Sequence, residues 1–392
     1  MTEPQLDHNS RVAARRRKRL RAGKRLKRDL GLILLCMIGI AALLTFGLLS
    51  DYGMFTRDTE KEPGQTREPD GHSRGLASEP EARVLSPVEK KRAVKLAELA
   101  ERPNELGKVP IIMYHVIGDN ESEWVRTPEN FRKDLQRFYE LGYSLVPLQS
   151  YLSGNIDLPK GASPLVVTFD DATLGQFRLV GGECVSPDPD CAVGILLEFS
   201  KSYPDFGHAA TFFVDFPCPF EVPDEADEKL NLLLEWGMEI GNHTYNHKNL
   251  WNVSGDLIQA ELGKLSKEIE QITGSKPLSL ALPYGGYPKD HRAREHLLAG
   301  VYEGWAYENR GVLLVGAEPA LSPYHKSLNP AAIPRIRGSE EELSKWLGYL
   351  DSSGTRYVSD GKPDTITVLD CDKEGIAEGL GDTYEVVVLR SE

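Results

Sequence analysis

The chain has 392 residues, of which 40% are hydrophobic and 27% are charged, and its formal net charge is −13 at pH 7. This length suffices for one large domain with appended segments, and the apolar content fits a globular core, which excludes a chain disordered throughout. The charge is unevenly distributed, because residues 11–28 contain eleven Lys and Arg and no acid. With three acids before position 30, this N-terminal part carries +8, and the remainder therefore carries −21.

Residues 30–50 follow the basic run, contain no charge and are dominated by Leu, Ile, Ala and Gly. As a helix they would span about 31 Å, close to the ~30 Å hydrocarbon thickness of a bilayer. The preceding cations predict a cytoplasmic segment (1–29), a transmembrane helix (30–50) and an extracytoplasmic remainder. A cleaved signal peptide is the alternative, but its apolar core is typically about 7–15 residues long and residues 48–51 are a poor cleavage site. A basic arm that binds nucleic acid is the other interpretation of the cations, and we expect no nucleic-acid partner.

The next segments predict a tether followed by a folded domain. Residues 51–86 are polar, with Pro, Gly, Ser and Glu throughout, and predict a disordered linker. A helix start at Ser86-Pro87 predicts a helical stalk over 87–107. Strands and helices then alternate, which indicates a parallel sheet, whereas 351–392 should form a small C-terminal β extension from runs at 365–369 and 384–389. Within the domain, strands are expected at 143–146, 164–169, 209–214, 238–241, 277–281, 301–307 and 332–336, and helices at 128–141, 192–202, 221–236, 253–273 and 340–350.

Two polar clusters each follow a predicted strand, namely Thr168-Phe169-Asp170-Asp171 and His243-Thr244-Tyr245-Asn246-His247. Two neutral imidazoles and one carboxylate can bind a divalent ion and leave positions open for water and substrate. The second carboxylate can take a proton from the water. Alone, the Asp pair could be a helix cap and the His pair two hydrogen-bonded structural histidines. Their coincidence, each after its own strand, favours metal-assisted hydrolysis.

A third cluster, Leu282-Pro283-Tyr284-Gly285, is a turn after an apolar run, and it can aim a backbone N–H into a site. In this order the clusters resemble the three motifs of the polysaccharide deacetylases with a NodB-type domain, carbohydrate esterase family 4. The resemblance implies an α/β fold, a distorted (β/α)7 barrel over residues 108–350. By this resemblance the metal ligands are Asp171, His243 and His247, the base is Asp170, and the Tyr284 N–H helps to bind the oxyanion.

The segment Ile111-Ile112-Met113-Tyr114-His115 is similar to the opening strand of the branch that includes the poly-β-1,6-N-acetylglucosamine deacetylases. The chain departs from the wider family at Ala281, where many members carry an Arg that orients the base, and at Ala172, where Gly is usual. The usual leucine-rich strand ending in the general-acid His is also absent. The branch implies His115 as the acid, although His115 could instead be a buried structural histidine. His325, in a Pro-bounded loop, is a weaker candidate.

These features predict a membrane-anchored hydrolase that removes N-acetyl groups from an extracytoplasmic polysaccharide of N-acetylated hexosamines. Zinc is the expected metal, and Co, Ni and Fe also suit these ligands. The alternative is a weak or inactive deacetylase-like domain that binds glycan or a partner at the cell surface, because the Arg and the usual acid are missing. For the cysteines, bridges between Cys184 and Cys191 or between Cys218 and Cys371 and free thiols are all compatible with the sequence.

Overall fold

The computed structural model describes residues 84–181 and 185–390. The predicted cytoplasmic segment and transmembrane helix, and nearly all of the predicted linker, lie outside these residues. Within the described part of the chain, no helix combines the length and the apolar character needed to cross a membrane.

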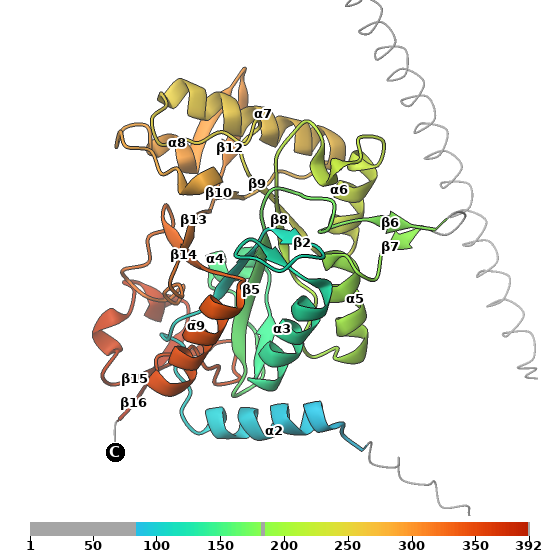
Figure 1. Ribbon diagram of the computed structural model, residues 1–392. Helices are drawn as coiled ribbons and strands as arrows, with labels where there is room; N and C mark the ends of the chain where they lie inside the picture. Colours follow the sequence, from blue (N-terminus) through green and yellow to red (C-terminus); the bar gives the residue numbers. More distant parts are fainter. Residues whose placement is uncertain (1–83, 182–184, 391–392) are drawn as a thin grey trace, which may run out of the picture. The chain divides into compact units, whose positions relative to one another are not determined.

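Seven parallel strands close into a barrel, as predicted from the family resemblance (Figure 1). The barrel strands are β1 (Ile111–Tyr114), β5 (Ser163–Phe169), β8 (Thr211–Val214), β9 (Glu239–Asn242), β10 (Ser279–Ala281), β13 (Gly311–Ala317) and β14 (Ile333–Arg337). The ring runs β1-β14-β13-β10-β9-β8-β5 and closes where β5 pairs with β1. An eighth strand, β4 (Tyr143–Leu145), pairs with the first residues of β5. The carboxyl ends of the seven barrel strands therefore meet at one end of the barrel.

Helices surround the barrel, and their starts follow local sequence signals (Figure 1). They are α2 (Pro87–Ala100), α3 (Pro128–Glu140), α4 (Leu148–Ser153), α5 (Ala192–Ser202), α6 (Ala226–Glu235), α7 (Gly255–Thr273), α8 (Glu295–Leu298) and α9 (Glu340–Ser353). Ser86 and Thr127 each accept a hydrogen bond from a backbone N–H of the first turn, and a proline follows each of them. The predicted helix over 221–236 begins only at Ala226, because a separate single turn occupies 219–221.

The predicted strand over 301–307 is wrong. This segment forms the antiparallel hairpin β11 (Ala299–Tyr302) and β12 (Trp305–Glu308), outside the barrel ring. The chain reverses because Glu303 and Gly304 adopt left-handed backbone angles, with φ of 48° and 78°. The barrel strand that follows, β13, has no counterpart among the predicted strands.

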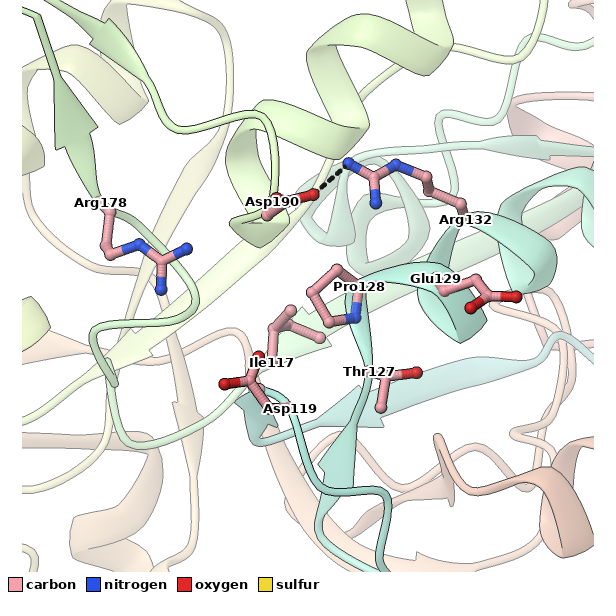
Figure 2. A pocket seen from close by; sticks show the side chains of 9 residues that line it. Ile117, Asp119, Thr127, Pro128, Glu129, Arg132, Arg178 and Asp190 are labelled. Carbon is pink, nitrogen blue, oxygen red and sulfur yellow. Dashed lines mark hydrogen bonds and ion pairs between the residues drawn. The ribbon is translucent and has the colours of Figure 1, made fainter.

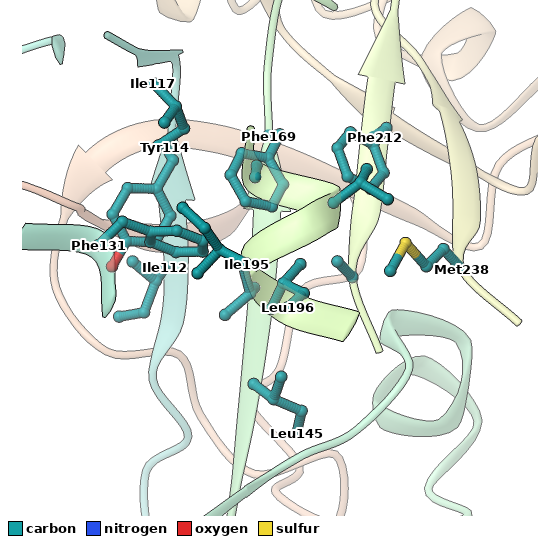
Figure 3. Packing of buried hydrophobic residues seen from close by; sticks show 14 of the residues in the cluster. Ile112, Tyr114, Ile117, Phe131, Leu145, Phe169, Ile195, Leu196, Phe212 and Met238 are labelled. Carbon is teal, nitrogen blue, oxygen red and sulfur yellow. The ribbon is translucent and has the colours of Figure 1, made fainter. Parts of the chain in front are cut away.

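The core aligns the strands that carry the first motif. All seven residues of β5 are buried, as expected for a strand covered on both faces. The Phe169 ring on β5 stacks on Phe212 of β8, with centroids 4.9 Å apart. Ile195 and Leu196 of α5 belong to the same buried cluster (Figure 3). This packing fixes the ends of β5 and β8, directly before the polar residues of the site.

Helix α2 is fastened to the barrel domain by a buried arginine. Arg92 donates hydrogen bonds to the Asp205 carboxylate at 2.8 Å and to the carbonyls of Tyr139 and Tyr143 at 3.0 and 2.6 Å. Its guanidinium also lies over the Tyr139 ring, 4.3 Å from the centroid. The predicted stalk helix thus packs against the domain through the buried Arg92 guanidinium, which donates hydrogen bonds to groups of the barrel domain.

The two C-terminal β runs pair with each other, and the pair packs against the barrel. Strands β15 (Thr365–Leu369) and β16 (Glu385–Leu389) are parallel. Ile366 and Val368 are buried in one cluster with Ile111 of β1. Glu105, also buried, accepts hydrogen bonds from the Thr367 N–H at 2.8 Å and from the Tyr357 hydroxyl at 3.2 Å. Burial raises the pKa of Glu105 from 4.5 to about 7.

This carboxyl group should make the stability of the protein depend on pH. Between pH of about 4.5 and about 7 the folded protein keeps the Glu105 proton that the unfolded chain has lost, so the free energy of unfolding should fall as pH rises. At about 1.4 kcal/mol per pKa unit, the loss is about 3 kcal/mol. Denaturant titrations across this window measure it. Glu105→Gln should remove this contribution to the pH dependence of the free energy of unfolding, whereas Glu374→Gln, at an exposed position of the same extension, should not. An identical pH dependence of the free energy of unfolding in wild type and Glu105→Gln would contradict the assignment.

Candidate metal centre and active site

The predicted site residues converge at the carboxyl end of the barrel. Asp170 and Asp171 follow β5, His243 follows β9, His115 follows β1, and Tyr284 lies in the turn after β10. Together with His247, all of them line one cavity of about 420 Å³, whose remaining lining residues are Trp124, Leu282 and Val315. The parallel barrel thus brings segments that are far apart in the sequence around one hollow.

Asp171, His243 and His247 form the candidate metal centre. One donor atom from each lies within 4.8 Å of the other two. The Nε2 atoms of both histidines are 3.1 Å from the same oxygen, Oδ1 of Asp171. Two imidazole nitrogens and one carboxylate are a donor set that suits a divalent transition metal and leaves further coordination positions for water and substrate. The three residues therefore fit the ion that the sequence predicts.

The other ring nitrogen of each histidine is also held. His243 Nδ1 lies 2.9 Å from the carbonyl oxygen of Ala281 and donates to it. When this imidazole is neutral, Nε2 is therefore the lone-pair nitrogen facing Asp171, and when it is protonated, Nε2 donates to Asp171. His247 Nδ1 lies 3.1 Å from the hydroxyl of Tyr284. These bonds fix the rotation of both rings before any ion binds.

Helix α7 holds the loop between the two histidines. Glu261, which is buried on α7, accepts two hydrogen bonds of 2.8 Å from the backbone N–H and the side-chain amide of Asn246. Asn242, the last residue of β9, accepts from the Thr244 N–H at 2.9 Å and donates to the Leu262 carbonyl at 2.9 Å. A loop secured in this way keeps two metal ligands at a fixed spacing.

Left-handed backbone conformations concentrate at the site. Of the nine non-glycine residues with positive φ in the described part of the chain, four belong to the three motifs, namely Asp171, Thr244, His247 and Tyr284, and a fifth, Ala172, directly follows the first motif. Such conformations cost free energy and persist where surrounding contacts enforce them, often at functional sites. Ala172, with a φ of 42°, stands where the resembling family usually has Gly, so its backbone keeps the conformation at some strain.

Arg335, which is absent from the predicted site residues, orients the candidate base. Its two terminal nitrogens donate to the two carboxylate oxygens of Asp170 at 2.8 and 2.7 Å. The side chains of Arg335 and Asp170 are 0% and 1% exposed. Arg335 Nε donates to the Leu314 carbonyl at 2.8 Å. Position 281 on β10 holds alanine where many family members carry the arginine that orients the base, and here β14 supplies an arginine to the base instead.

A sequence signal for Arg335 does exist. Arg335 stands in the short run Ile333-Pro334-Arg335-Ile336, between two isoleucines. A charged residue in a buried strand needs a partner of opposite charge. That signal indicates a buried ion pair, but it does not identify Asp170 as the partner.

The carboxyl groups of the site are ionised. Burial by itself would raise the pKa of Asp170, but the Arg335 guanidinium and His243 outweigh it and hold the pKa below its ordinary value. Burial opposes ionisation of Asp171 too, and hydrogen bonds from His243 and His247 hold its pKa far below the usual range. For His243, burial lowers the pKa, but Asp170 and Asp171 raise it above the ordinary value. Protons and a metal ion therefore compete for this imidazole, and metal affinity should weaken as pH falls.

The two histidines considered as general acid lie in different places. His115 lines the cavity, its Nδ1 has no hydrogen-bond partner within the described residues, and its ring contacts Trp124 with centroids 4.7 Å apart. Burial lowers the pKa of His115. His325 instead accepts a hydrogen bond from the Ser327 N–H and pairs with Ile376 of the C-terminal extension, and it does not line the cavity.

Asp215 is a second residue near the centre that the sequence motifs did not indicate. It directly follows β8, and burial raises its pKa although His243 and His247 act in the opposite direction. The sequence signal that could have indicated Asp215 is its position directly after the strand predicted over 209–214.

Three of the cysteines are free in the described part of the chain, namely Cys191, Cys218 and Cys371. Cys191 is buried, and its sulfur accepts a hydrogen bond from the Gly194 N–H at the start of α5. A bridge between Cys218 and Cys371 is thus not formed, and Cys184 lies outside the described residues.

Comparisons with known proteins point to one family. Residues 158–299 match the family model described as polysaccharide deacetylase. The uncharacterized protein YlxY of Bacillus subtilis is 42% identical over 53 residues, which are 14% of this chain and 17% of that protein. The putative polysaccharide deacetylase YxkH of the same bacterium is 21% identical over 188 residues, 47% of this chain and 59% of that protein. The matches thus span less than two thirds of either relative.

Among solved structures, the Streptococcus pyogenes deacetylase PplD in complex with acetate is 19% identical, with a TM-score of 0.46, over 61% of this chain and 98% of that one. The segment matched by the family model contains Asp170, Asp171, His243, His247 and Tyr284. On this match residues 158–299 are similar to the polysaccharide deacetylase family.

Proposed function

We propose that the chain is a metal-dependent N-deacetylase that hydrolyses acetamide groups on a polysaccharide of N-acetylated hexosamines, such as an exopolysaccharide or a cell-wall glycan. One observation carries the proposal: an ionised carboxylate, Asp170, held by Arg335, lines the same cavity as the ligand set Asp171, His243 and His247. Metal-assisted amide hydrolysis needs both a ligand set with open positions and a base beside it.

A divalent ion held by Asp171, His243 and His247 would polarise the acetamide carbonyl and lower the pKa of the attacking water. Asp170 takes the proton of this water, because its carboxylate is ionised and aimed by Arg335. The backbone N–H of Tyr284 is proposed to donate to the oxyanion. Collapse of the tetrahedral intermediate releases acetate and an amine, and the amine leaves only after it gains a proton.

Zinc is the proposed ion, since two imidazoles and a carboxylate with open positions are typical of catalytic zinc sites. Cobalt, nickel and iron suit the same ligands. The measurement is metal content of the purified protein, followed by removal and replacement of each ion in turn.

Acetate release separates this function from the alternative, a domain that only binds glycan or a partner. The protein should release acetate from one of three substrates, peptidoglycan, chitooligosaccharides or β-1,6-linked N-acetylglucosamine oligomers. A chelator should stop the release, and added zinc should restore it. Binding of one of these glycans without acetate release at any metal would support the alternative. Two reasons supported that alternative, the missing arginine and the missing usual acid. The first no longer holds, because Arg335 supplies the arginine that position 281 lacks.

His115 is proposed to protonate the departing amine. Since burial lowers its pKa, the imidazole is mostly neutral at neutral pH and must gain a proton before it gives one. A positioned acid is worth roughly 10²–10⁴-fold, so His115→Ala should lower kcat by about that factor with unchanged metal content. His325→Ala is the control and should do much less.

The leaving group distinguishes an acid from a structural histidine at position 115. An activated ester such as nitrophenyl acetate needs no proton on its leaving group, so His115→Ala should hydrolyse it almost normally. An equal loss on ester and amide would show that His115 only supports the structure of the site.

The proposed location is extracytoplasmic, with residues 30–50 as a membrane anchor and the N-terminus in the cytoplasm. The support is the uncharged segment preceded by eleven cations. Protease added to intact protoplasts should therefore remove the barrel domain and leave a small membrane-bound fragment. Full protection of the domain would overturn this topology.

A further inference from the structure

A second hollow, of about 440 Å³, shares no lining residue with the catalytic cavity. Its walls come from the turn after β2 (Val116–Ile117), from the first turn of α3 and from the segment around the hairpin of β6 (Leu179–Val180) and β7 (Ser186–Pro187). Figure 2 shows Asp119, Arg132, Arg178 and Asp190 arranged around it.

The hollow presents unused donors and acceptors. Arg178 uses its Nε to bind Asp188 at 2.9 Å, and its two terminal nitrogens make no hydrogen bond with the described residues. Arg132 binds the Pro189 carbonyl and Asp190 through one nitrogen only, at 2.6 and 2.8 Å. The Asp119 carboxylate has no hydrogen bond or ion pair in the described part of the chain and is exposed. Guanidinium donors and carboxylate acceptors therefore face one space.

The wall that carries Arg178 is held in place by its own hydrogen bonds. The Asp188 N–H donates to the Arg178 carbonyl at 2.9 Å, and the Asp190 N–H donates to the Asp188 carboxylate at 2.8 Å. Arg132 of α3 joins this wall to the opposite side. Because these groups are already ordered, a ligand would lose little binding free energy to ordering them.

Two short stretches of chain connect the hollow to the catalytic residues. Ile117 lies two residues after His115, a separation of about 7 Å in an extended strand. Arg178 lies two residues after Gln176, whose side-chain amide donates to the carbonyls of His115 and Asp170, at 2.5 Å each.

We propose that this hollow binds a second, neutral hexosamine unit of the same polysaccharide; the proposal rests on the proposed deacetylase function. Sugar hydroxyls donate and accept hydrogen bonds, which matches the free nitrogens of Arg178 and the free carboxylate of Asp119. Pro128, which is partly exposed, supplies apolar surface for the C–H face of the ring. The lining holds two arginines and three carboxylates, Asp119, Glu129 and Asp190, so neither a polyanion nor a polycation is favoured.

The test is the dependence of KM on chain length. Arg178→Ala and Asp119→Ala should raise KM for hexameric substrate about tenfold, the effect of losing hydrogen bonds to a charged group. Both should leave kcat unchanged, and both should leave KM for the monosaccharide, which has no second unit to enter the hollow, unchanged. Arg102→Ala, at an exposed position after α2, is the matched control and should change neither.

Binding of the same hexamer and of the monosaccharide to Asp170→Asn, measured by calorimetry, tests the hollow without turnover. Arg178→Ala in this background should weaken binding of the hexamer about tenfold and leave binding of the monosaccharide unchanged. If wild type releases no acetate from any substrate, the deacetylase function fails, but this binding comparison still decides the role of the hollow. Equal effects on the hexamer and the monosaccharide, or no effect on the hexamer, would overturn the proposal.

Discussion

Replacing Asp170 with Asn should lower kcat by about 10²–10⁴-fold while the protein still binds metal, because the amide cannot take a proton from water. His243→Ala, Asp171→Ala and His247→Ala should instead lose metal and activity together, because each removes one of three donors. The two classes of variant separate the base from the ligands, although Asp170 and Asp171 are neighbours in the chain.

The substitution also leaves the charge of Arg335 buried without its carboxylate. Breaking a buried ion pair typically costs about 3–5 kcal/mol, so Asp170→Asn should unfold at lower temperature or denaturant concentration. Activity must therefore be measured on protein shown to be folded, with metal content determined on the same sample. Near-normal turnover by folded, metal-loaded Asp170→Asn would show that another group is the base.

Arg335→Met should lower kcat strongly with little change in KM, because Arg335 contacts the base and is not among the residues that line the cavity. The variant should also lose about 3–5 kcal/mol of stability, since it leaves the Asp170 carboxylate buried and unpaired. Arg335→Lys keeps the charge but loses the two-pronged contact, and it should recover part of both losses. Arg310→Met, at an exposed position directly before β13, is the matched control.

A pH profile distinguishes positioning of the base from a purely structural role. Arg335 holds the pKa of Asp170 below its ordinary value against the opposing effect of burial. Loss of the guanidinium should therefore raise this pKa, and the acidic limb of kcat/KM should move to higher pH in Arg335→Met. The limb should move less in Arg335→Lys, which keeps the charge. Reduced activity with an unshifted acidic limb would mean that Arg335 only supports the fold.

Local sequence determined much of the site. The apolar run of β5 predicts a strand buried on both faces, and the polar residues after β5 and β9 predict where the metal ligands gather. The spacing of His243 and His247 sets a short loop whose two imidazoles face one carboxylate oxygen. Helix starts at Ser86 and Thr127 follow equally from nearby residues. The helix starts depend on contacts between residues close in the chain, and the metal ligands are marked by their positions directly after apolar strand runs, which is why the sequence by itself determines these features.

Only the tertiary structure decided which residue orients the base. Asp170 and Arg335 are 165 positions apart and meet because β14 and β5 both pair with β1. No spacing rule links them, since barrel closure, not chain distance, makes them neighbours. The hollow between Arg178 and Arg132 is likewise a consequence of packing. A buried charge in a strand can be read from sequence, but its partner is set by the strand order of the closed barrel.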